Sequence, residues 1–303
     1  MENRFDEKCE LSATNILDLE GRSINGVRIG EILGEGCFGV VYTGEKAGTS
    51  LAVKVANINS ANQKRSTTNE IEMLRRLRRT TGVVQYIGVY QVNKMHFMYL
   101  ELAFMNLHDL LGKNRSRRFT EATCRKIIHH GLKIIQRIHG KNIIHRDIKT
   151  DNFLVSLPKS PMNEVSLILG DFGLSKSLNG TDPRRRHDFK SAFHATPHIL
   201  NGSMPTMQDD IIQFGYVALE TVGMSLSELE LEELNEFKKN LLKAPETAMM
   251  NQSKFFLPLF EEISRLELNT PINYDKLLKA VPLKNFHDSR LFLEKKKGVL
   301  KFP

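Results

Sequence analysis

The sequence has little cysteine and no tryptophan. Its three cysteines, Cys9, Cys37 and Cys124, are scattered, and no pair has the CxxC spacing. Neither a disulfide scaffold nor a structural zinc site is therefore expected. The chain opens on polar residues, which argues against a secretory signal peptide. No apolar run approaches the length of a membrane span, and no repeat of roughly 20–50 residues occurs. We expect an intracellular protein, in the cytoplasm, the nucleus or both, with no membrane partner.

The composition is that of a globular protein. Hydrophobic residues make up 41% of the 303 residues and charged residues 26%, which suffices for a sizeable core. The length fits one two-lobed domain with short tails. The formal net charge of +8 invites a nucleic-acid or acidic partner, but a generally basic soluble protein explains this charge equally well.

The first hundred residues have the pattern of a sheet with one helix. Short apolar bursts separated by glycines predict three strands between Val27 and Ala56. Two further strands are expected around Val83–Tyr90 and Met95–Leu100, whereas Asn62–Leu77 has the apolar spacing of a helix. Residues 1 to about 26 are polar and weakly patterned, and we interpret them as an extension.

After Ala103 the pattern becomes helical. Thr120 is suited to cap a long helix that ends near His139. The glutamate-rich run Glu228–Glu236 predicts a solvated helix face, and the lysines at Lys295–Lys297 predict a solvated tail. Further helices are expected over Asp209–Val222 and Lys254–Leu268.

A glycine-rich segment lies between the first two predicted strands. Glycines in a tight turn are common, so a plain turn is one interpretation. Because the next element is again a strand, the segment does not fit a dinucleotide-binding βαβ unit. A glycine hairpin can instead fold over a triphosphate and offer unobstructed backbone N–H groups. Its residues are Leu33, Gly34, Glu35, Gly36, Cys37, Phe38, Gly39, Val40 and Val41.

One lysine interrupts the apolar strand that follows. Burying an unpaired ammonium is costly, so Lys54 needs an anionic partner unless its side chain reaches water at the strand end. A nucleotide phosphate and Glu70, on the predicted helix, are the candidates.

Two polar loops carry the strongest chemical signal. The first runs from His145 to Asn152 and includes Asp147 and Lys149; the second contains Asp171. Magnesium prefers oxygen ligands, commonly one or two side chains together with substrate phosphates. Asn152 and Asp171 can supply such oxygens, Asp147 can accept a proton from an attacking hydroxyl, and Lys149 can neutralise a moving phosphoryl group.

The chain resembles the eukaryotic protein kinases over roughly residues 27–285. It has four of their motifs in the same order: the glycine-rich segment, the strand lysine, the HRDxxxxN loop that ends at Asn152 and the DFG loop that contains Asp171. Residues 151–155 and the Asp209-Asp210 pair are most similar to the casein kinase 1 group, which includes the vaccinia-related kinases. The resemblance implies ATP and Mg²⁺ as cofactors.

The resemblance also implies an architecture. We expect an α+β protein with the bilobal protein kinase fold, in which an N-lobe (about 27–103) has a five-stranded antiparallel sheet and one helix. A mainly helical C-lobe would cover about 104–285. Residues 1–26 would be an N-terminal extension and residues 286–303 a basic C-terminal tail.

Nucleotide-binding roles follow from the resemblance. Residues Leu33–Val41 would cover ATP, and Lys54 would hold its α- and β-phosphates while pairing with Glu70. Leu100 would be the gatekeeper, and the hinge from Glu101 to Ala103 would bind adenine through backbone groups.

Catalytic roles follow in the same way. Asp147 would be the catalytic aspartate, Lys149 would contact the γ-phosphate, and Asn152 and Asp171 would bind magnesium. A lysine two residues after the aspartate is typical of serine/threonine kinases. Asp210 would anchor the catalytic loop from a large central helix.

The chain departs from the common kinase pattern after the DFG loop. No Ala-Pro-Glu occurs, and the casein kinase 1 group departs there too. Ala195 replaces the usual glycine, and Thr196 aligns with the threonine that normally contacts the catalytic loop. Residues 225–253 match no family segment.

Arginines between the DFG loop and Thr196 have three interpretations. Arg184, Arg185 and Arg186 can belong to a solvated loop, or they can bind acidic or already phosphorylated substrates. Alternatively, Arg146 beside the catalytic aspartate clamps a phosphorylated residue of this segment, for which the candidates are Ser177, Thr181 and Ser191.

We expect an active, monomeric serine/threonine kinase that acts on protein substrates without a need for nucleic acid. A non-catalytic kinase-fold scaffold is the main alternative, although such proteins usually lack one of the positions that Lys54, Asp147 and Asp171 fill here. A small-molecule kinase is a third hypothesis, against which the activation-type segment argues.

Overall fold

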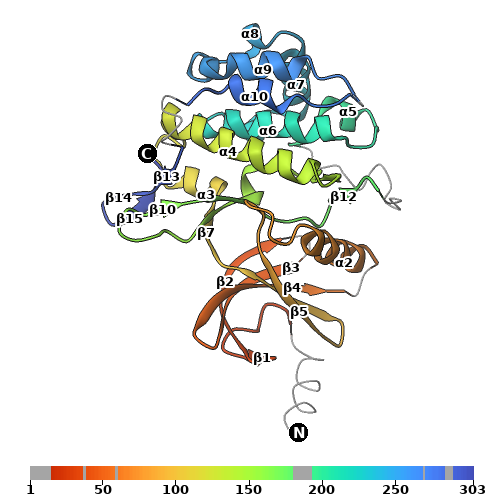
Figure 1. Ribbon diagram of the computed structural model, residues 1–303, viewed down its shortest axis with the longest axis vertical. Coiled ribbons are helices and arrows are strands. Elements are labelled where there is room, and N and C mark those ends of the chain that lie inside the picture. Colours follow the sequence, from red (N-terminus) through yellow and green to blue (C-terminus); the bar gives the residue numbers. More distant parts are fainter. Residues whose placement is uncertain (1–14, 37–38, 59–60, 180–192, 269, 284–288) are drawn as a thin grey trace, which may run out of the picture. The chain divides into compact units, whose positions relative to one another are not determined.

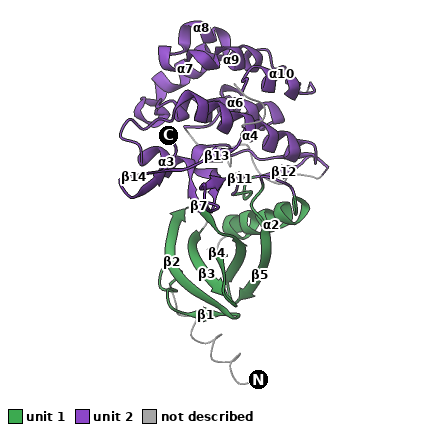
Figure 2. Cartoon of the chain, turned by 60° about the vertical axis from the view of Figure 1, so that its left-hand side comes forward, with its two compact units in different colours: residues 1–79, 83–103, 171–174 green, residues 80–82, 104–170, 175–303 purple. Residues whose placement is uncertain are grey.

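The structure, a computed structural model, describes residues 15–36, 39–58, 61–179, 193–268, 270–283 and 289–303 (Figure 1). The chain divides into two compact units (Figure 2). Unit 1 comprises residues 1–79, 83–103 and 171–174, and unit 2 comprises residues 80–82, 104–170 and 175–303. In the described part of the chain, no helix is long and apolar enough to span a membrane.

Unit 1 is a six-stranded antiparallel sheet with one helix, α2 (Ala61–Arg76). Its strand order is β1-β2-β3-β4-β6-β5. The five predicted strands and the predicted helix are present. The strands are β1 (Ser23–Ile24), β2 (Val27–Gly36), β3 (Gly39–Lys46), β4 (Thr49–Asn57), β5 (Tyr86–Val92) and β6 (Met95–Glu101).

The additional strand comes from the segment that the sequence predicts as an extension. Ile24 of β1 pairs with Val27, and both Ile24 and Leu19 are buried in the core of the sheet. The Tyr42 hydroxyl donates to the carbonyl of Ile16 at 2.6 Å. Residues 15–26 therefore belong to unit 1, because a few apolar side chains in a polar segment suffice to hold it on the sheet.

Unit 2 is mainly helical, and two of its helices carry the polar residues described below. In α4 (Glu121–His139) the Thr120 hydroxyl accepts from the Thr123 N–H, which is the predicted N-cap. In α6 (Met207–Thr221) Thr206 and Asp209 form a capping box. The helices come close because α4 has glycine at 131, where an added Cβ would lie 2.1 Å from the Phe214 ring.

The remaining elements of unit 2 are shorter than α4 and α6. The helices are α3 (Leu107–Gly112), α5 (Pro197–Leu200), α7 (Leu231–Lys243), α8 (Pro245–Ala248), α9 (Leu257–Ser264) and α10 (Tyr274–Lys279), with 3-10 turns at Thr150–Asn152, Leu226–Glu228 and Asn251–Phe256. The sheets are β11-β9-β7, β12-β8, β10-β13 and β14-β15. Their strands are β7 (Ala103–Asn106), β8 (Ile143–Ile144), β9 (Phe153–Ser156), β10 (Glu164–Val165), β11 (Leu167–Leu169), β12 (Lys176–Ser177), β13 (Leu291–Phe292), β14 (Glu294–Lys296) and β15 (Val299–Lys301).

Two helix predictions in unit 2 need correction. The helix expected over Lys254–Leu268 starts as a 3-10 turn and is α-helical only from Leu257, where Pro258 lies in the first turn, to Ser264. The run Glu228–Glu236 is not one solvated face, because α7 begins at Leu231 and its Leu234 is fully buried.

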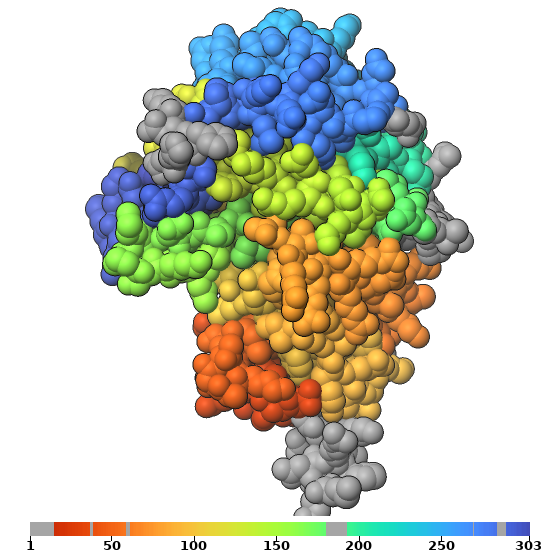
Figure 3. All heavy atoms as spheres, viewed as in Figure 1, coloured from red at the N-terminus to blue at the C-terminus, as the bar shows by residue number. Residues whose placement is uncertain are grey.

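The prediction of a solvated C-terminal tail is wrong for residues 289–303. Leu291 of β13 pairs with Val165 of β10, and in Figure 3 the last residues lie against the green segment that contains β10. Phe302 is fully buried against Phe119, and the Pro303 carbonyl accepts from the Thr120 N–H at 2.8 Å. The lysines point outward, but the apolar residues near them bind the segment to unit 2.

Candidate active-site residues

The glycine-rich segment forms the hairpin between β2 and β3. Gly36 pairs with Gly39, and the motif residues from Leu33 to Val41 lie on these two strands except for Cys37 and Phe38, which fall outside the described residues. At Gly39 φ is +142°, and an added Cβ would lie 2.1 Å from the Val55 carbonyl oxygen. Only glycine fits where β3 passes so close to β4.

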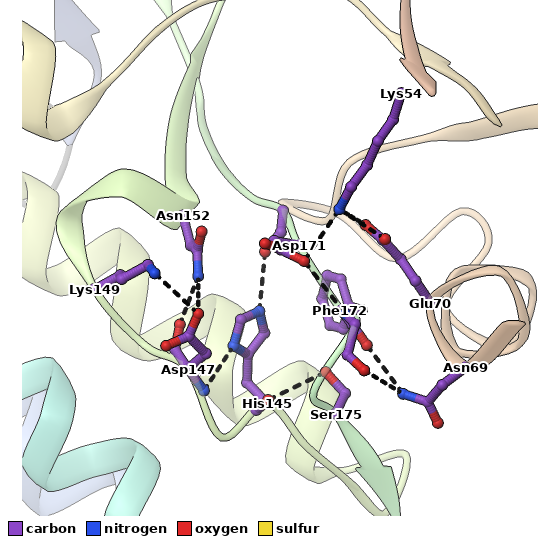
Figure 4. A network of polar contacts seen from close by, with 12 residues as sticks. Lys54, Asn69, Glu70, His145, Asp147, Lys149, Asn152, Asp171, Phe172 and Ser175 are labelled. Atoms are coloured by element: carbon purple, nitrogen blue, oxygen red, sulfur yellow. Dashed lines mark hydrogen bonds and ion pairs between the residues drawn. The ribbon is translucent and has the colours of Figure 1, made fainter. Parts of the chain in front are cut away.

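Lys54 lies at the centre of an ionic cluster in unit 1 (Figure 4). Its Nζ contacts the Glu70 oxygens at 2.7 and 2.9 Å and the Asp171 Oδ1 at 3.2 Å. The Lys54 side chain is 13% exposed and that of Glu70 only 4%. Burial by itself opposes the charge, but the carboxylates of Asp171 and Glu70 outweigh it and hold the pKa of Lys54 above its ordinary value. The lysine is therefore a charged group with two anionic partners.

Helix α2 makes a second link to the segment 171–174. The Asn69 amide donates to the carbonyls of Phe172 and Gly173 at 3.2 and 3.1 Å (Figure 4). An added Cβ at Gly173 would lie 2.6 Å from the Ser66 hydroxyl, so glycine permits this close approach. Asn69 was not singled out by the sequence analysis. Its position next to Glu70, on the buried side of a helix, was the available signal.

The predicted hinge residues follow the buried Leu100 at the end of β6. The Glu101 N–H donates to the Gln85 carbonyl at 3.0 Å, and its carboxylate accepts from the Gln85 N–H at 2.7 Å. Burial raises the pKa of Glu101, although the Gln85 hydrogen bond opposes this shift. Ala103 is the first residue of β7. In unit 1, both the backbone N–H and the carboxylate of Glu101 thus form hydrogen bonds with the backbone of Gln85.

In unit 2 the polar loop brings Asp147, Lys149 and Asn152 together (Figure 4). The Asp147 Oδ2 accepts from the Lys149 Nζ at 3.1 Å and from the Asn152 Nδ2 at 3.0 Å. The same amide nitrogen donates to the Asp147 carbonyl at 2.7 Å. These bonds use the amide N–H groups, so Asn152 presents its carbonyl oxygen as the atom suited to a cation.

His145 orients the start of the same loop. Its Nδ1 accepts from the Asp147 N–H at 3.3 Å, so Nε2 carries the ring proton and donates to the Gly170 carbonyl at 2.9 Å. The ring is fully buried, and the His145 carbonyl accepts from the Ser175 hydroxyl at 3.2 Å. Within unit 2, His145 therefore connects the loop to the residues on either side of the DFG segment.

Asp210, from α6, holds the backbone of the loop. It is fully buried and accepts from the N–H groups of His145 and Arg146 at 2.7 and 2.8 Å, as the resemblance implied. Arg146 has φ +72°, in the left-handed region that costs a non-glycine residue energy. The paired backbone bonds to a carboxylate offset this cost.

Gln213, one turn after Asp210 in α6, also contacts the loop. Its Oε1 accepts from the Ile148 N–H at 3.1 Å. Sequence reasoning missed Gln213, although a polar residue three positions after Asp210 lies on the same helix face and was a usable signal.

The segment around Thr196 is held by α6 and α7. The Thr196 hydroxyl contacts the Asp209 carboxylate, and His198 Nδ1 lies 3.0 Å from the same group. Among the described residues this hydroxyl makes no bond to the catalytic loop, which differs from the predicted contact. The fully buried Lys238 donates to the Ala195 carbonyl at 2.9 Å. Lys238 was not predicted as a site residue.

The proposed anion-binding and phosphorylation positions are only partly described. Ser177 is buried in β12. Thr181, Arg184, Arg185, Arg186 and Ser191 lie outside the described residues.

Residues 27–281 match the protein kinase domain. Casein kinase I homolog 2 of Schizosaccharomyces pombe is 26% identical over 287 residues, which cover 82% of this chain and 65% of the relative. The serine/threonine-protein kinase KIC1 of Saccharomyces cerevisiae is 31% identical over 195 residues, which cover 63% of this chain and 17% of the relative.

A further relative is the serine/threonine-protein kinase pakF of Dictyostelium discoideum, 26% identical over 227 residues, which cover 71% of this chain and 18% of that protein. The chain thus spans less than two thirds of the length of these three relatives. The domain match covers most of the chain and contains both groups of motif residues described above. The chain belongs to the protein kinase family.

Proposed function

We propose that the protein is a serine/threonine kinase that transfers the γ-phosphate of ATP to hydroxyl groups of protein substrates. The observation that carries the proposal is the buried Lys54 ammonium, held between Glu70 and Asp171. Two carboxylates hold this mostly buried ammonium in a fixed position, and a positioned cation of this kind suits the phosphates of a nucleotide.

In unit 1 the proposed nucleotide-binding groups are mainly backbone. Residues Leu33–Val41 would cover the phosphates with N–H groups, and Lys54 would bind the α- and β-phosphates while Glu70 keeps its ammonium in place. The backbone groups of Glu101 and Ala103 would bind adenine. The hydrogen bonds between Glu101 and Gln85 support a rigid end of β6.

In unit 2 the proposed chemistry centres on Asp147. Its carboxylate would orient the substrate hydroxyl and accept its proton as the oxygen attacks the γ-phosphorus. Lys149, 3.1 Å from Asp147, would contact the γ-phosphate and stabilise charge on the moving phosphoryl group. Because the Asn152 amide donates to both the carboxylate and the backbone carbonyl of Asp147, the carboxylate is held in place before a substrate arrives.

Asn152 and Asp171 are the proposed ligands of a divalent cation, which we propose to be Mg²⁺. Both offer oxygen donors: the amide of Asn152 is oriented by Asp147, and the Asp171 side chain is 34% exposed. This donor set fits a hard cation. When bound, the cation would neutralise charge on the nucleotide phosphates.

We further propose a substrate preference for acidic or already phosphorylated sites, as in the casein kinase 1 group. The alignment with casein kinase I homolog 2 over 82% of the chain supports this assignment. Arg184, Arg185 and Arg186 would supply the anion-binding charge. Replacing all three by alanine is then expected to weaken transfer to acidic peptides more than transfer to neutral ones.

The proposal is tested by phosphoryl transfer from labelled ATP and Mg²⁺ to casein and to a basic protein. The key variant is Asp147→Asn, and Asp151→Asn, an exposed aspartate of the same loop, is the matched control. We expect the first to nearly abolish transfer with ATP binding retained, and the second to leave transfer unchanged. Transfer at the wild-type rate by Asp147→Asn refutes the assigned role. ATP binding without any transfer by the wild type would favour a scaffold.

A further inference from the structure

A line of three side chains, the partly buried Tyr274 and the buried His139 and Asp210, reaches the catalytic loop from the far end of the chain. The hydroxyl of Tyr274, the first residue of α10, contacts Nδ1 of His139. The His139 Nε2 lies 2.9 Å from the Asp210 Oδ2, and Asp210 holds the backbone N–H groups of His145 and Arg146. All these residues belong to unit 2.

The direction of the hydrogen bonds follows from the groups themselves. The Asp210 carboxylate can only accept, so the His139 Nε2 must carry a proton and donate it. Burial, followed by the negative charge of Asp210, holds the pKa of Tyr274 far above its ordinary value. The tyrosine hydroxyl is thus a neutral donor, and it donates to the lone pair of the His139 Nδ1.

Among the described residues, the Tyr274 hydroxyl is the one group that forms a hydrogen bond with the His139 Nδ1. His139 is 5% exposed and ends α4, where its ring packs edge-on against Tyr274 with the centroids 6.1 Å apart. Without the hydroxyl, Nδ1 would lose its hydrogen bond in a buried site, and a rotated ring would no longer be excluded.

Contacts of α10 with its N-cap and with the core fix the position of Tyr274. Asn273 caps α10 by accepting from the Lys276 N–H at 3.1 Å, and Leu277 of the same helix is buried. Tyr274 is 135 positions from His139 in the sequence, so only the packing of α10 on α4 brings them together.

We propose that Tyr274 is a positioning residue for the catalytic loop: its hydroxyl holds the His139 ring in the orientation in which Nε2–H donates to Asp210, and this bond orients the Asp210 carboxylate that binds the backbone of His145 and Arg146. The catalytic consequence rests on the proposed kinase function. The placement of the loop does not, so the two can be tested separately.

The test compares Tyr274→Phe, which removes only the hydroxyl, with Tyr42→Phe. Tyr42 is a matched control because it is fully buried in unit 1 and donates its hydroxyl to a backbone carbonyl. Three properties are measured: the ¹⁵N chemical shifts of the histidine rings, amide hydrogen exchange of residues 143–150, and kcat and KM for ATP. The His139 signal is assigned by its loss in His139→Gln, and thermal unfolding confirms that each variant is folded.

In the wild type we expect His139 shifts typical of the Nε2–H tautomer. In Tyr274→Phe we expect these shifts to change, and the loop amides to exchange about five times faster, which corresponds to the loss of one neutral hydrogen bond. The value of kcat is expected to fall about fivefold for the same reason, with KM for ATP changed less than about twofold. Tyr42→Phe should alter none of these quantities.

Unchanged His139 shifts and unchanged loop exchange in Tyr274→Phe would overturn the proposal. Equal losses in both tyrosine variants would also overturn it, because they would indicate a general loss of stability. If the wild type transfers no phosphate, the proposed function fails, whereas the ring shifts and the amide exchange still decide whether Tyr274 positions the loop.

Discussion

Replacing Asp210 by asparagine is the most direct measure of how firmly α6 holds the catalytic loop. The carboxylate is fully buried and accepts three hydrogen bonds, from the N–H groups of His145 and Arg146 and from His139. Asparagine has nearly the same shape, so the substitution leaves no cavity. It replaces one acceptor oxygen with an NH₂ donor and removes the charge.

The expected cost follows from these three bonds. The amide oxygen can still accept from Arg146, and His139 can change tautomer to accept from the amide NH₂. The His145 N–H then faces another donor, and a buried unpaired N–H costs about 2 kcal/mol. The bonds with Arg146 and with His139 remain, but each is weaker by about 1 kcal/mol because the charged carboxylate has become a neutral amide. The free energy of unfolding should therefore fall by about 4 kcal/mol.

The assay is urea-induced unfolding followed by far-ultraviolet circular dichroism, with hydrogen exchange of residues 143–150 as a local readout. Asp275→Asn, an exposed aspartate in the first turn of α10, is the control and should change the free energy of unfolding by less than about 0.5 kcal/mol. A loss below about 1 kcal/mol for Asp210→Asn, with unchanged exchange in the loop, would refute the reasoning.

Two further predictions concern pH. His129 is buried, neither ring nitrogen has a hydrogen-bond partner among the described residues, and burial lowers its pKa to about 4 from 6.5. Between these pH values the unfolded chain binds more protons than the folded one, so the wild type loses stability as pH falls through this window. In His129→Phe, the unfolding temperature should therefore depend less on pH over the same window. A variant as sensitive to acid as the wild type would contradict this. Burial likewise lowers the pKa of Lys238 to about 8 from 10.5. Its contribution to stability should therefore rise as pH increases through that range, and the rise should be absent in Lys238→Met; an identical slope in both proteins would exclude it.

Local signals in the sequence account for much of the fold. Alternating apolar residues predicted the strands β2 to β6, and the apolar stripe of residues 62–77 predicted α2, because one buried face imposes its period on the chain. Thr120 predicted the start of α4 correctly, since capping depends only on residues a few positions apart. The motif positions also come together as clusters: Lys54 with Glu70 and Asp171, and Asp147 with Lys149 and Asn152.

Contacts over long sequence separations were beyond such signals. β1 was missed because its two residues form a strand only by pairing with β2. The C-terminal segment was predicted to be solvated from its lysines, yet Phe302 anchors it beside Phe119, a residue far away in sequence. The helix expected from Lys254 begins instead at Leu257, because Pro258 is tolerated only in a first turn.

The sequence by itself determined the protein's chemistry: which side chains are charged, where glycine permits a close backbone approach, and which loops carry the acids, the amide and the lysines. Only the tertiary structure decided what supports them. Asp210, His139 and Tyr274 lie on three different helices, and nothing periodic in the sequence relates them. Their hydrogen bonds exist because packing of α4, α6 and α10 removes water from these polar groups, so that each must find its partner within the protein.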